Sequence, residues 1–497
     1  MSSFAPDTID CPSGSFIAGR FVRGGGDELP VERPSDGAVL GIFREASEAD
    51  VDEAVRCAAE TRRAERWGSG DPRRRGAVLR RWAELVERDR EYLARLEALC
   101  SSRPVTEARQ RDIPVVAELL RYYGECADKC PGEVLATSHD ALNMVEHEAW
   151  GVVLAISPWN VPALLAAAKV APALAAGNAV ILKPSELTPL SMLRIAELGV
   201  EAGLPRGLFS VLVGRGPTTG RAAVRHPLVG YVSFTGSTAT GAAIMSDAAH
   251  HGMKPVSMEL GGKSPQVVFA DAPDLEKVAD LVALGVSRNA GQICFAGTRL
   301  IVEEAVAERF VGKVVERLRG VRPGPTWREE TDLPPIISKR QADRIEALVE
   351  SGRAGGAKVV AGGERFVLDG GQYFAPTVMA ELGSDNPALR EEIFGPVLGV
   401  QTFRGFDEAM RLADHPVYGL TASLYTRDID KAIHGARAIE AGTIWINGYG
   451  RGADLGSPFG GFKQSGFGKD FGIDGFKKYR RSKSINVFLT EAEREAA

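Results

Sequence analysis

The chain has 497 residues, which is too many for one hydrophobic core, so we expect two or three domains. Its formal net charge of −5, from 60 basic and 65 acidic residues, gives no bulk attraction for nucleic acid. Six cysteines in so long a chain exclude a disulfide framework and favour a reducing, cytoplasmic setting.

The sequence contains no segment that is typical of a targeting signal or of a membrane span. The N-terminal MSSFAPDTIDCPSG lacks a basic region followed by an apolar one. The most apolar stretch, 161–182, contains Lys169, Pro172 and Gly177, so it is predicted to form a helix, a turn and a strand inside a core. We expect neither a membrane nor a nucleic acid as partner.

Cys126 and Cys130 are four residues apart and form half of a possible metal site. No cluster of histidine or cysteine completes the set, so we interpret both as structural and predict no metal.

The first part of the chain is predicted to be helical. SEAD (47–50) has the pattern of a capping box, with Ser47 as the cap and Asp50 three residues on. Apolar residues in 76–99 recur at helical spacing.

From about residue 151 short apolar runs alternate with helical segments, which indicates βαβ units and a mostly parallel sheet. The first set of predicted strands is 152–156, 179–182, 209–213 and 229–234, with helices near 163–176, 188–202 and 238–250. A second set of strands follows at 299–302, 358–361, 397–403, 420–426 and 443–447. The expected fold is therefore α/β, with two doubly wound domains that meet at a cleft.

Two segments do not belong to either set of strands. Residues 136–149 interrupt the order between the helical part and the first strands, and the polar KSINVF (483–488) comes late in the chain. Together they are predicted to form an edge hairpin or an oligomerisation arm.

Three stretches have features of a cofactor site. FTGSTATG (234–241) follows an apolar strand and precedes a helix, so the amides of Gly236 and Ser237 could face a pyrophosphate, although a simple capped turn has the same pattern. ILKPSE (181–186) ends a strand with Lys183 and Glu186, which fit ribose hydroxyls or form an ordinary surface pair. VGRGPTTG (213–220) does not have the GxGxxG spacing.

Candidate chemistry centres on NAGQICFAGTR (289–299), where Cys294 is either a buried packing residue or a nucleophile. A thiol nucleophile needs a donor for the oxyanion and a base. SPWN (157–160) offers the amide of Asn160, and MELGGKSP (258–265) places Glu259 before two glycines. REEIFGP (390–396) adds Glu392. Each of these residues also has an ordinary structural interpretation.

The motifs PWN, KPSE, FTGST, ELGGKSP, GQICFAGTR, EEIFGP and PFGGFKQSGFG occur in this order. Together they resemble the aldehyde dehydrogenase superfamily over about residues 14–488. The resemblance implies NAD(P)-dependent oxidation of an aldehyde to a carboxylic acid. It implies that Cys294 attacks the aldehyde, that Asn160 holds the oxyanion, and that Glu259 activates the water that hydrolyses the thioester. Lys169 matches a proton-relay lysine of the family.

The resemblance also implies a variant Rossmann fold that binds the dinucleotide without GxGxxG. It assigns Lys183 and Glu186 to the adenosine ribose, which favours NAD, with NADP possible. It assigns Glu392 and Phe394 to the nicotinamide ribose and ring, and Gln341 as a further ribose contact. The remaining predicted cofactor residues are Ile156, Trp159, Gly216, Phe234, Gly236, Ser237 and Leu260.

On this resemblance we expect a cofactor-binding domain of residues 1–135 and 150–260, and a catalytic domain of residues 261–460. Residues 136–149 and 476–497 are expected to form an oligomerisation arm of a homodimer or homotetramer. Candidate walls of the aldehyde tunnel are Val161, Ile293 and Phe295. The segment 447–458, which contains Tyr449, Arg451 and Asp454, corresponds to the substrate-facing region of the family, but its sequence does not identify the substrate.

Two alternatives remain at this point. A CoA-acylating enzyme of the same family typically lacks the glutamate of ELGG, which is present here as Glu259. A catalytically inactive relative on the same fold is opposed by the intact Cys294, Asn160 and Glu259.

Overall fold

The computed structural model of the protein describes residues 4–450 and 454–489. Five parallel strands form the centre of a first, eight-stranded sheet, and antiparallel segments close its two edges. In sheet order the strands are β2 (Arg20–Val22), β1 (Ser15–Ile17), β9 (Phe209–Val211), β8 (Ala179–Lys183), β7 (Val152–Ile156), β10 (Val229–Thr235), β11 (Val256–Glu259) and β23 (Gly466–Phe467).

The chain reverses its direction of travel across this sheet after β9. It runs from β7 through α6 (Pro162–Ala175) to β8 and through α7 (Leu190–Glu201) to β9. It then returns through α8 (Arg221–Arg225) to β10, on the other side of β7, and continues through α9 (Thr238–His250) to β11. Right-handed crossovers therefore place α6 and α7 on one face and α9 on the other. The reversal leaves a crevice at the carboxyl ends of β7 and β10.

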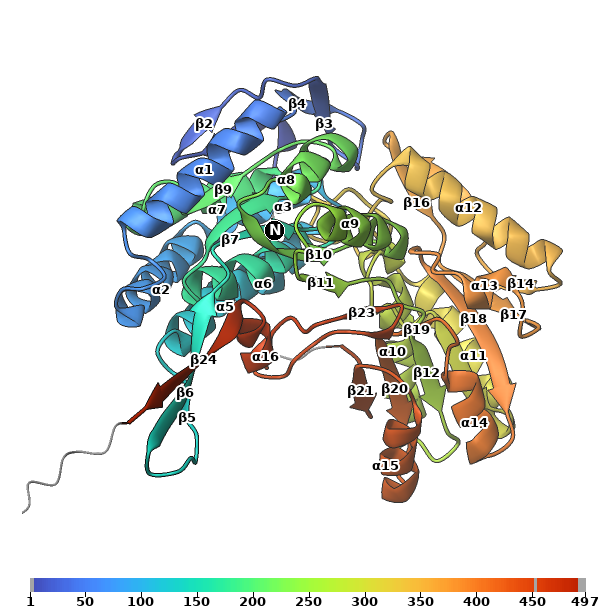
Figure 1. Ribbon diagram of the computed structural model, residues 1–497. Helices are drawn as coiled ribbons and strands as arrows, with labels where there is room; N and C mark the ends of the chain where they lie inside the picture. Colours follow the sequence, from blue (N-terminus) through green and yellow to red (C-terminus); the bar gives the residue numbers. More distant parts are fainter. Residues whose placement is uncertain (1–3, 451–453, 490–497) are drawn as a thin grey trace, which may run out of the picture.

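Two helices of the first part, α2 and α5, form a second layer outside α6, whereas α1 packs directly on β7, β8 and β9 of the first sheet. α2 packs on α5, and α5 packs on α6 (Figure 1). The helices of the first part are α1 (Glu48–Ala64), α2 (Pro72–Arg88), α3 (Arg90–Cys100), α4 (Val105–Glu107), a π-helical turn (Ala108–Asp112) and α5 (Ile113–Cys126). The capping box is confirmed, because the Ser47 side chain accepts from the Asp50 amide and the Asp50 carboxylate accepts from the Ser47 amide.

A second, seven-stranded sheet is parallel except for its first edge strand. Its strands, in order, are β14 (Lys358–Ala361), β17 (Thr377–Ala380), β18 (Val397–Phe403), β13 (Arg299–Glu303), β12 (Pro265–Val268), β20 (Thr421–Tyr425) and β21 (Thr443–Ile446). The accompanying helices are α10 (Leu275–Ser287), α11 (Ala307–Arg319), α12 (Lys339–Ala354), α13 (Pro387–Arg390), α14 (Phe406–Ala413) and α15 (Ile429–Ala438). The predicted α/β class is thus confirmed in both halves.

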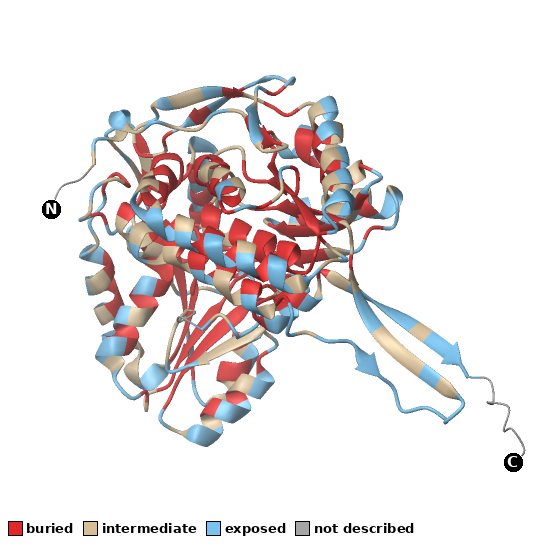
Figure 2. Ribbon diagram, turned by 90° about the vertical axis from the view of Figure 1, so that its left-hand side faces the viewer, coloured by how far each residue is buried: buried red, intermediate tan, exposed pale blue. Residues whose placement is uncertain are grey.

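A three-stranded sheet projects from the body of the molecule (Figures 1 and 2). It consists of β24 (Arg480–Phe488), β6 (Ala141–Ala149) and β5 (Glu133–Val134). β24 pairs with β6 over its whole length, as the two segments 136–149 and 483–488 predicted. It follows α16 (Gly472–Lys477). The predicted arm range 476–497 extends beyond this strand, and its residues 490–497 lie outside the described residues.

The prediction of a helical first part is wrong for residues 15–44. Besides β1 and β2, these residues form a hairpin of β3 (Glu28–Glu32) and β4 (Val39–Arg44). β1 gains its sheet by pairing Phe16 with Val211, almost two hundred residues away, and local periodicity carries no signal of such a partner. The helical run in 76–99 is divided at Asp89 between α2 and α3.

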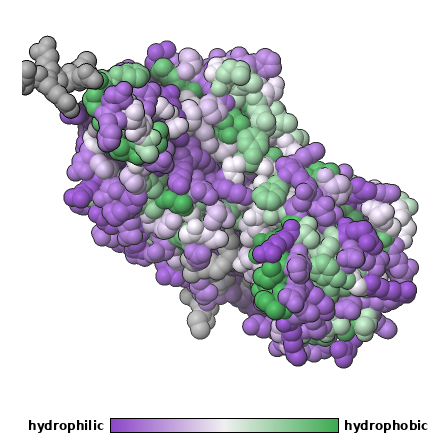
Figure 3. Space-filling model, turned by 60° about the horizontal axis from the view of Figure 1, so that its bottom comes forward, coloured by the Kyte–Doolittle hydropathy of each residue, from purple (hydrophilic) through white to green (hydrophobic). Residues whose placement is uncertain are grey.

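Two further two-stranded sheets complete the fold, β15 (Arg365–Leu368) with β16 (Gly371–Phe374) and β19 (Tyr418–Gly419) with β22 (Phe462–Lys463). The stretch 161–182 forms the predicted helix, turn and strand, which are almost entirely buried. Within 4–450 and 454–489 no helix has the length and apolarity that a bilayer crossing requires. The surface in Figure 3 is mainly hydrophilic, with smaller hydrophobic patches, as is usual for a globular protein.

Candidate active site

Two strand edges meet at the candidate active site. One is the carboxyl edge of the first sheet, where β7, β8, β10 and β11 end, and the other is the amino edge of the second sheet, where β12, β13 and β18 begin. The chain crosses directly between them, from Glu259 at the end of β11 to Pro265 at the start of β12. The predicted site residues come from these two edges and the turns beside them.

The predicted cofactor residues of the first sheet gather at its carboxyl edge. Ile156, the last residue of β7, is in register with Lys183 at the end of β8 and with Phe234 near the end of β10. Trp159 follows in the turn after β7, and Glu186 follows in the turn after β8. Parallel pairing therefore assembles residues that are far apart in the sequence.

Lys183 and Glu186 form an ion pair with Nζ 3.1 Å from Oε2, and the Glu186 side chain is 32% exposed. A Cβ added at Gly220, in the π-helical turn Gly216–Gly220, would lie 3.9 Å from Lys183 Cδ, so this turn lies beside the pair. Gly216 itself is exposed, with open space beside it. The pair retains donors and acceptors for further hydroxyl groups.

The Gly236 amide, which is predicted to lie near a pyrophosphate, already has an acceptor within the protein. That amide donates to the carbonyl of Glu259 at 3.0 Å and extends the pairing of β10 with β11. Gly236 allows a close approach instead, because a Cβ there would lie 2.4 Å from the Phe234 ring. Ser237 caps α9, with its Oγ accepting from the Thr240 amide at 3.3 Å.

Trp159 and Phe394 connect the two edges. Their ring centroids are 5.3 Å apart in an edge-to-face arrangement, which joins the turn after β7 to the segment before β18. Gln341, on α12, donates from Nε2 to the Phe394 carbonyl at 3.0 Å. Phe394 has a φ of +56°, an unusual value for a residue with a side chain, so its surroundings hold it in place.

The glycines of ELGG are required by close contacts. A Cβ at Gly261 would lie 2.2 Å from Glu392 Oε2, and one at Gly262 would lie 2.8 Å from the Cys294 carbonyl oxygen. The Gly262 amide also donates to Glu392 Oε1 at 3.1 Å. Burial raises the pKa of Glu392 to about 7. Leu260 is buried, and its amide donates to the carbonyl of Ser465 at 3.0 Å.

A left-handed turn precedes Cys294. Asn289, Ala290 and Gly291 have φ values of 50°, 52° and 70° in succession. Gly291 is required here, since a Cβ would lie 2.2 Å from the Gly395 carbonyl oxygen. Two adjacent non-glycine residues in this conformation store strain, which is typical of functional sites.

Asn160 reaches this turn from the first sheet. Its Nδ2 donates to the Gln292 carbonyl at 3.0 Å, and its own carbonyl accepts from Asn289 Nδ2 at 3.0 Å. An amide nitrogen carries two hydrogens, so a second donor of Asn160 remains beside the segment that holds Cys294. The structure therefore brings Asn160 and the cysteine loop together, as predicted.

The Cys294 thiol is held in its protonated form by its surroundings. Burial, together with the charges of Glu392 and Glu259, raises its pKa to about 12, against the opposing effect of the amides of Phe295 and Cys294. The reactive species of a thiol is the thiolate, so a base or a nearby positive charge has to activate it.

We expect the alkylation of Cys294 by iodoacetamide, in protein freed of nucleotide, to accelerate about tenfold per pH unit between pH 7 and 10. The raised pKa gives this slope, because only the thiolate reacts and its fraction grows with pH. Peptide mapping by mass spectrometry separates Cys294 from the other five cysteines. A plateau below pH 9 would contradict the raised pKa.

Glu259 is 5% exposed, and neither of its carboxylate oxygens has a hydrogen-bond partner among the described residues. Burial and the charge of Asp470 raise its pKa well above the ordinary value, and nearby lysines oppose this shift. Its Oε1 lies over the backbone of Gly460, where a Cβ would be 2.6 Å away. A buried carboxylate with free oxygens and a raised pKa is suited to act as a base near neutral pH.

Lys169 is fully buried, with Nζ 3.0 Å from Asp470 Oδ2 and 3.3 Å from Ser233 Oγ. Lys478 pairs with the other oxygen of Asp470. Asp470 and Lys478 are not among the site residues that the sequence predicts. The available signal is the run GKDFGIDGFKKY, in which charged residues directly follow the PFGGFKQSGFG motif.

Aromatic rings pack around Phe295, the residue after the thiol. Its centroid lies 5.7 Å from Trp445, 6.1 Å from Tyr449 and 6.0 Å from Phe459. Tyr449 OH donates to the Phe295 carbonyl at 3.1 Å. Arg451, predicted to face the substrate, lies outside the described residues.

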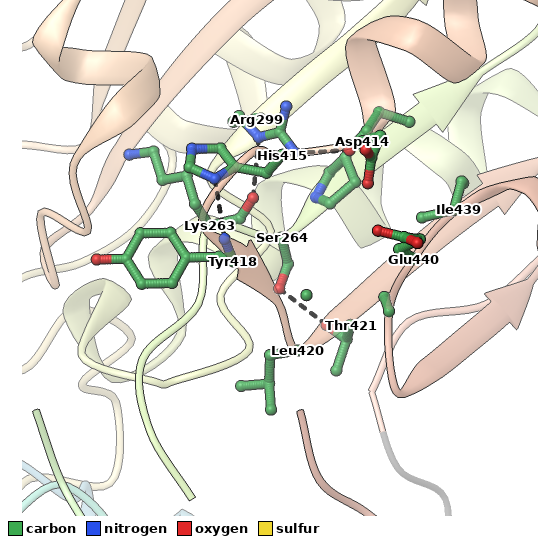
Figure 4. A pocket seen from close by; sticks show the side chains of 14 residues that line it. Lys263, Ser264, Arg299, Asp414, His415, Tyr418, Leu420, Thr421, Ile439 and Glu440 are labelled. Carbon is green, nitrogen blue, oxygen red and sulfur yellow. Dashed lines mark hydrogen bonds between the residues drawn. The ribbon is translucent and has the colours of Figure 1, made fainter. Parts of the chain in front are cut away.

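A small pocket is lined by Lys263 and Ser264, the two residues after ELGG, together with residues of the second sheet and its loops (Figure 4). Arg299 donates to the carbonyl of Lys263 at 2.9 Å, and Thr421 bonds Ser264 at 2.9 Å. Cys294, Asn160 and Glu259 do not line it. These contacts hold Lys263 and Ser264, which lie between the ELGG turn and the start of β12, and so stabilise the position of that turn.

Comparison with known proteins agrees with this geometry. The protein-family model described as "Aldehyde dehydrogenase family" matches residues 21–485. An aldehyde dehydrogenase of Aspergillus niger is 39% identical over 97% of this chain and 96% of its own length. The NADP/NAD-dependent aldehyde dehydrogenase PuuC of Escherichia coli K12 is 38% identical over 95% of each chain. A crystal structure of indole-3-acetaldehyde dehydrogenase with NAD+ superposes with a TM-score of 0.95 at 40% identity, over 97% of this chain and 98% of that one. The chain therefore belongs to the aldehyde dehydrogenase family and is an oxidoreductase.

Proposed function

We propose that this enzyme oxidises an aldehyde to the carboxylic acid with NAD, using Cys294 as nucleophile and Glu259 as base. The observation that carries the proposal is that Asn160 is bonded to the loop of Cys294, while Glu259 lies nearby, buried and with both oxygens free. These are the three groups that thiol-based acyl chemistry requires.

In the proposed reaction the Cys294 thiol first loses its proton to solvent, and the sulfur of the thiolate then forms a bond to the carbonyl carbon of the aldehyde. The second hydrogen of Asn160 Nδ2 and the amide of Cys294 stabilise the oxygen as it becomes an anion. Bound NAD supplies the hydride acceptor for the oxidation. Glu259 then takes a proton from water, whose oxygen attacks the resulting thioester and releases the acid and the thiolate. Lys169 and Asp470 offer a buried path for the proton that Glu259 has gained.

The residues at the carboxyl edge fit an NAD molecule. Lys183 and Glu186 would hold the adenosine ribose at the end of β8, beside the topological switch of the sheet. Ile156, Phe234 and Leu260 offer apolar walls. Glu392 and Gln341 would hold the nicotinamide ribose, with Phe394 beside the ring. A buried carboxylate held by the Gly262 amide is a preformed acceptor for hydroxyl groups.

Glu186→Ser is expected to shift the NAD/NADP ratio of kcat/KM toward NADP by about tenfold or more, because it removes a negative charge that repels a 2′-phosphate. Initial rates with each cofactor at a fixed aldehyde concentration measure the ratio. Glu197→Ser, a carboxylate change on the neighbouring α7, is the matched control and should leave it unchanged. An unchanged ratio in Glu186→Ser would remove Glu186 from the ribose site.

We further propose that residues 1–135 and 150–260 bind the cofactor, that 261–460 carry the catalytic cysteine, and that 136–149 and 476–497 form an arm that pairs with a second copy of the chain. Val134 and Phe488 of the projecting sheet are 71% and 84% exposed, so the arm presents apolar side chains that a second copy of the chain would cover.

Light scattering of the purified protein is expected to give the mass of a dimer or tetramer. Replacing both Val134 and Phe488 by Glu should shift it toward the monomer, because charges on the arm oppose burial between subunits. Val367→Glu, on the β15–β16 hairpin where the side chain is 62% exposed, is the matched control. A monomeric mass for the unchanged protein would reject the proposed arm.

The function itself is tested with a panel of aliphatic, aromatic, amino-terminated and carboxy-terminated aldehydes, ranked by kcat/KM with NAD and no CoA. NADH formation with release of the free acid is the expected result. Turnover that appears only after CoA is added would replace hydrolysis by acyl transfer to CoA.

A further inference from the structure

Glu97 is a fully buried carboxylate that the proposed mechanism does not use. It lies on α3, and each of its oxygens accepts one hydrogen bond from a different helix. Oε1 accepts from the backbone amide of Ala163 on α6 at 3.0 Å, and Oε2 accepts from the hydroxyl of Ser191 on α7 at 2.5 Å. Glu97 thus joins the first turns of two helices that follow neighbouring strands of the sheet.

The N-terminus of α6 has no cap of its own. Val161, at the cap position, has no side chain that can accept a hydrogen bond, and Pro162 carries no N–H. Ala163 therefore has the first amide that needs a partner outside the helix. A carboxylate at this place is also stabilised by the helix dipole. Glu97 supplies from α3 the cap that the local sequence lacks.

This cap acts on the turn that carries the oxyanion donor. Asn160 precedes the cap position by one residue, so its backbone is fixed on one side by the start of α6. On the other side the cysteine loop holds it, through Asn289 Nδ2 to the Asn160 carbonyl at 3.0 Å and Asn160 Nδ2 to the Gln292 carbonyl at 3.0 Å. Without Glu97 the first turn of α6 would lose this hydrogen bond, and Asn160 would keep its hydrogen bonds to the cysteine loop.

The neighbouring Arg103 does not use Glu97 as its ion-pair partner. Arg103 is committed to Asp112, with Nε 2.7 Å from Oδ2, and to Glu107. Burial raises the pKa of Glu97 to about 7, against the effect of its two hydrogen bonds. A neutral side chain of the same length can therefore replace it, because the carbonyl oxygen of glutamine still accepts from Ala163.

We infer that Glu97 is a positioning residue for the oxyanion hole: by capping α6 and tying it to α7, it holds Asn160 in register with Cys294. The inference rests on the proposed role of Asn160. Oxyanion stabilisation requires donors within a few tenths of an ångström of the developing charge, and a shift of 1 Å costs up to about a hundredfold in rate.

The test compares two reactions of Cys294 that need no cofactor. Acylation by p-nitrophenyl acetate creates an oxyanion, whereas alkylation by iodoacetamide displaces iodide and creates none. Glu97→Ala is expected to lower the acylation rate by about tenfold to a hundredfold while the alkylation rate stays within about twofold. The ratio of the two rates isolates the oxyanion hole from the reactivity of the thiol.

Two further substitutions of Glu97 separate the effect of side-chain length from the effect of side-chain charge. Glu97→Gln keeps the length and should restore the ratio to nearly that of the unchanged protein. Glu97→Asp keeps the charge but withdraws the oxygens by one methylene group, so its ratio should fall between those of Gln and Ala. If Glu97→Ala does not fold, as judged by circular dichroism, the comparison of Gln with Asp carries the test.

Asp428→Ala is the matched control. Asp428 caps α15 by accepting from the amides of Asp430 and Lys431, far from the site in sequence, and its loss should lower stability without changing the ratio. Equal ratios in Glu97→Ala and the unchanged protein would overturn the inference, as would a parallel fall of both rates or a ratio that Asp restores and Gln does not.

Failure of the proposed function remains distinguishable. An Asn160→Ala variant with an unchanged ratio would reject Asn160 as oxyanion donor. Absence of NADH formation with every aldehyde would reject the oxidation and leave the Glu97 comparison intact.

Discussion

Replacing Cys294 by Ala is expected to reduce kcat for aldehyde oxidation by about 10⁴-fold or more, because no other described side chain takes the place of the nucleophile. The affinity for NAD should remain within about twofold, since the cofactor residues at the ends of β7, β8 and β10 do not depend on the thiol. Initial rates of NADH formation measure the first quantity, and quenching of tryptophan fluorescence by NAD measures the second.

Cys57→Ala is the matched control, because Cys57 is also a partly buried free cysteine but lies on α1. It should retain full activity. If Cys294→Ala kept even a tenth of the activity, the covalent mechanism would be wrong. If NAD binding were lost as well, the substitution would have disturbed the crevice and a Cys294→Ser variant would be needed to decide.

Glu259→Gln is expected to separate oxidation from hydrolysis. The amide cannot take a proton from water, so the thioester on Cys294 should accumulate and steady-state turnover should fall by about 10³-fold. The first turnover should still proceed, giving a burst of about one NADH per active site. Stopped-flow absorbance measures the burst, and mass spectrometry of the quenched protein detects the acyl group on Cys294.

Glu391→Gln, an exposed carboxylate next to Glu392, is the control and should show normal turnover without a burst. A Glu259→Gln variant that loses the burst and the steady state together would show that Glu259 acts before the thioester forms, for example by deprotonating the thiol. The raised pKa of Glu259 predicts that hydrolysis in the unchanged enzyme accelerates with rising pH, because the carboxylate is the active form.

The strands of the two parallel sheets could be predicted from the sequence because their signal is local. The run 152–156 is buried throughout and coincides with β7, and the run 397–403 coincides with β18 and is buried over its first four residues, since a strand segment covered on both faces has to be apolar. β1 could not be predicted in this way. It is three residues long, it pairs with β2 directly after it in the chain, and it joins the first sheet through the pairing of Phe16 with Val211.

In the candidate site, too, some features follow from local sequence and others depend on contacts between distant residues. Each motif had an ordinary interpretation by itself, and only the resemblance of the ordered set to the aldehyde dehydrogenase superfamily pointed to a shared reaction. The Gly236 amide of FTGST is an example of the second kind, because a local pattern does not reveal that this amide continues the pairing of β10 with β11.

The sequence by itself determined the fold class, the order of the motifs, and the residue types for a nucleophile, an oxyanion donor and a base. These depend on periodicity and composition over short stretches. Only the tertiary structure decided which groups are joined: Asn160 to the Gln292 carbonyl, Glu392 to the Gly262 amide, Lys169 to Asp470, and Glu97 to the starts of α6 and α7. These contacts connect residues 66 to 301 positions apart, and they form because burial of the two sheets removes water and leaves each polar group to find a partner within the protein.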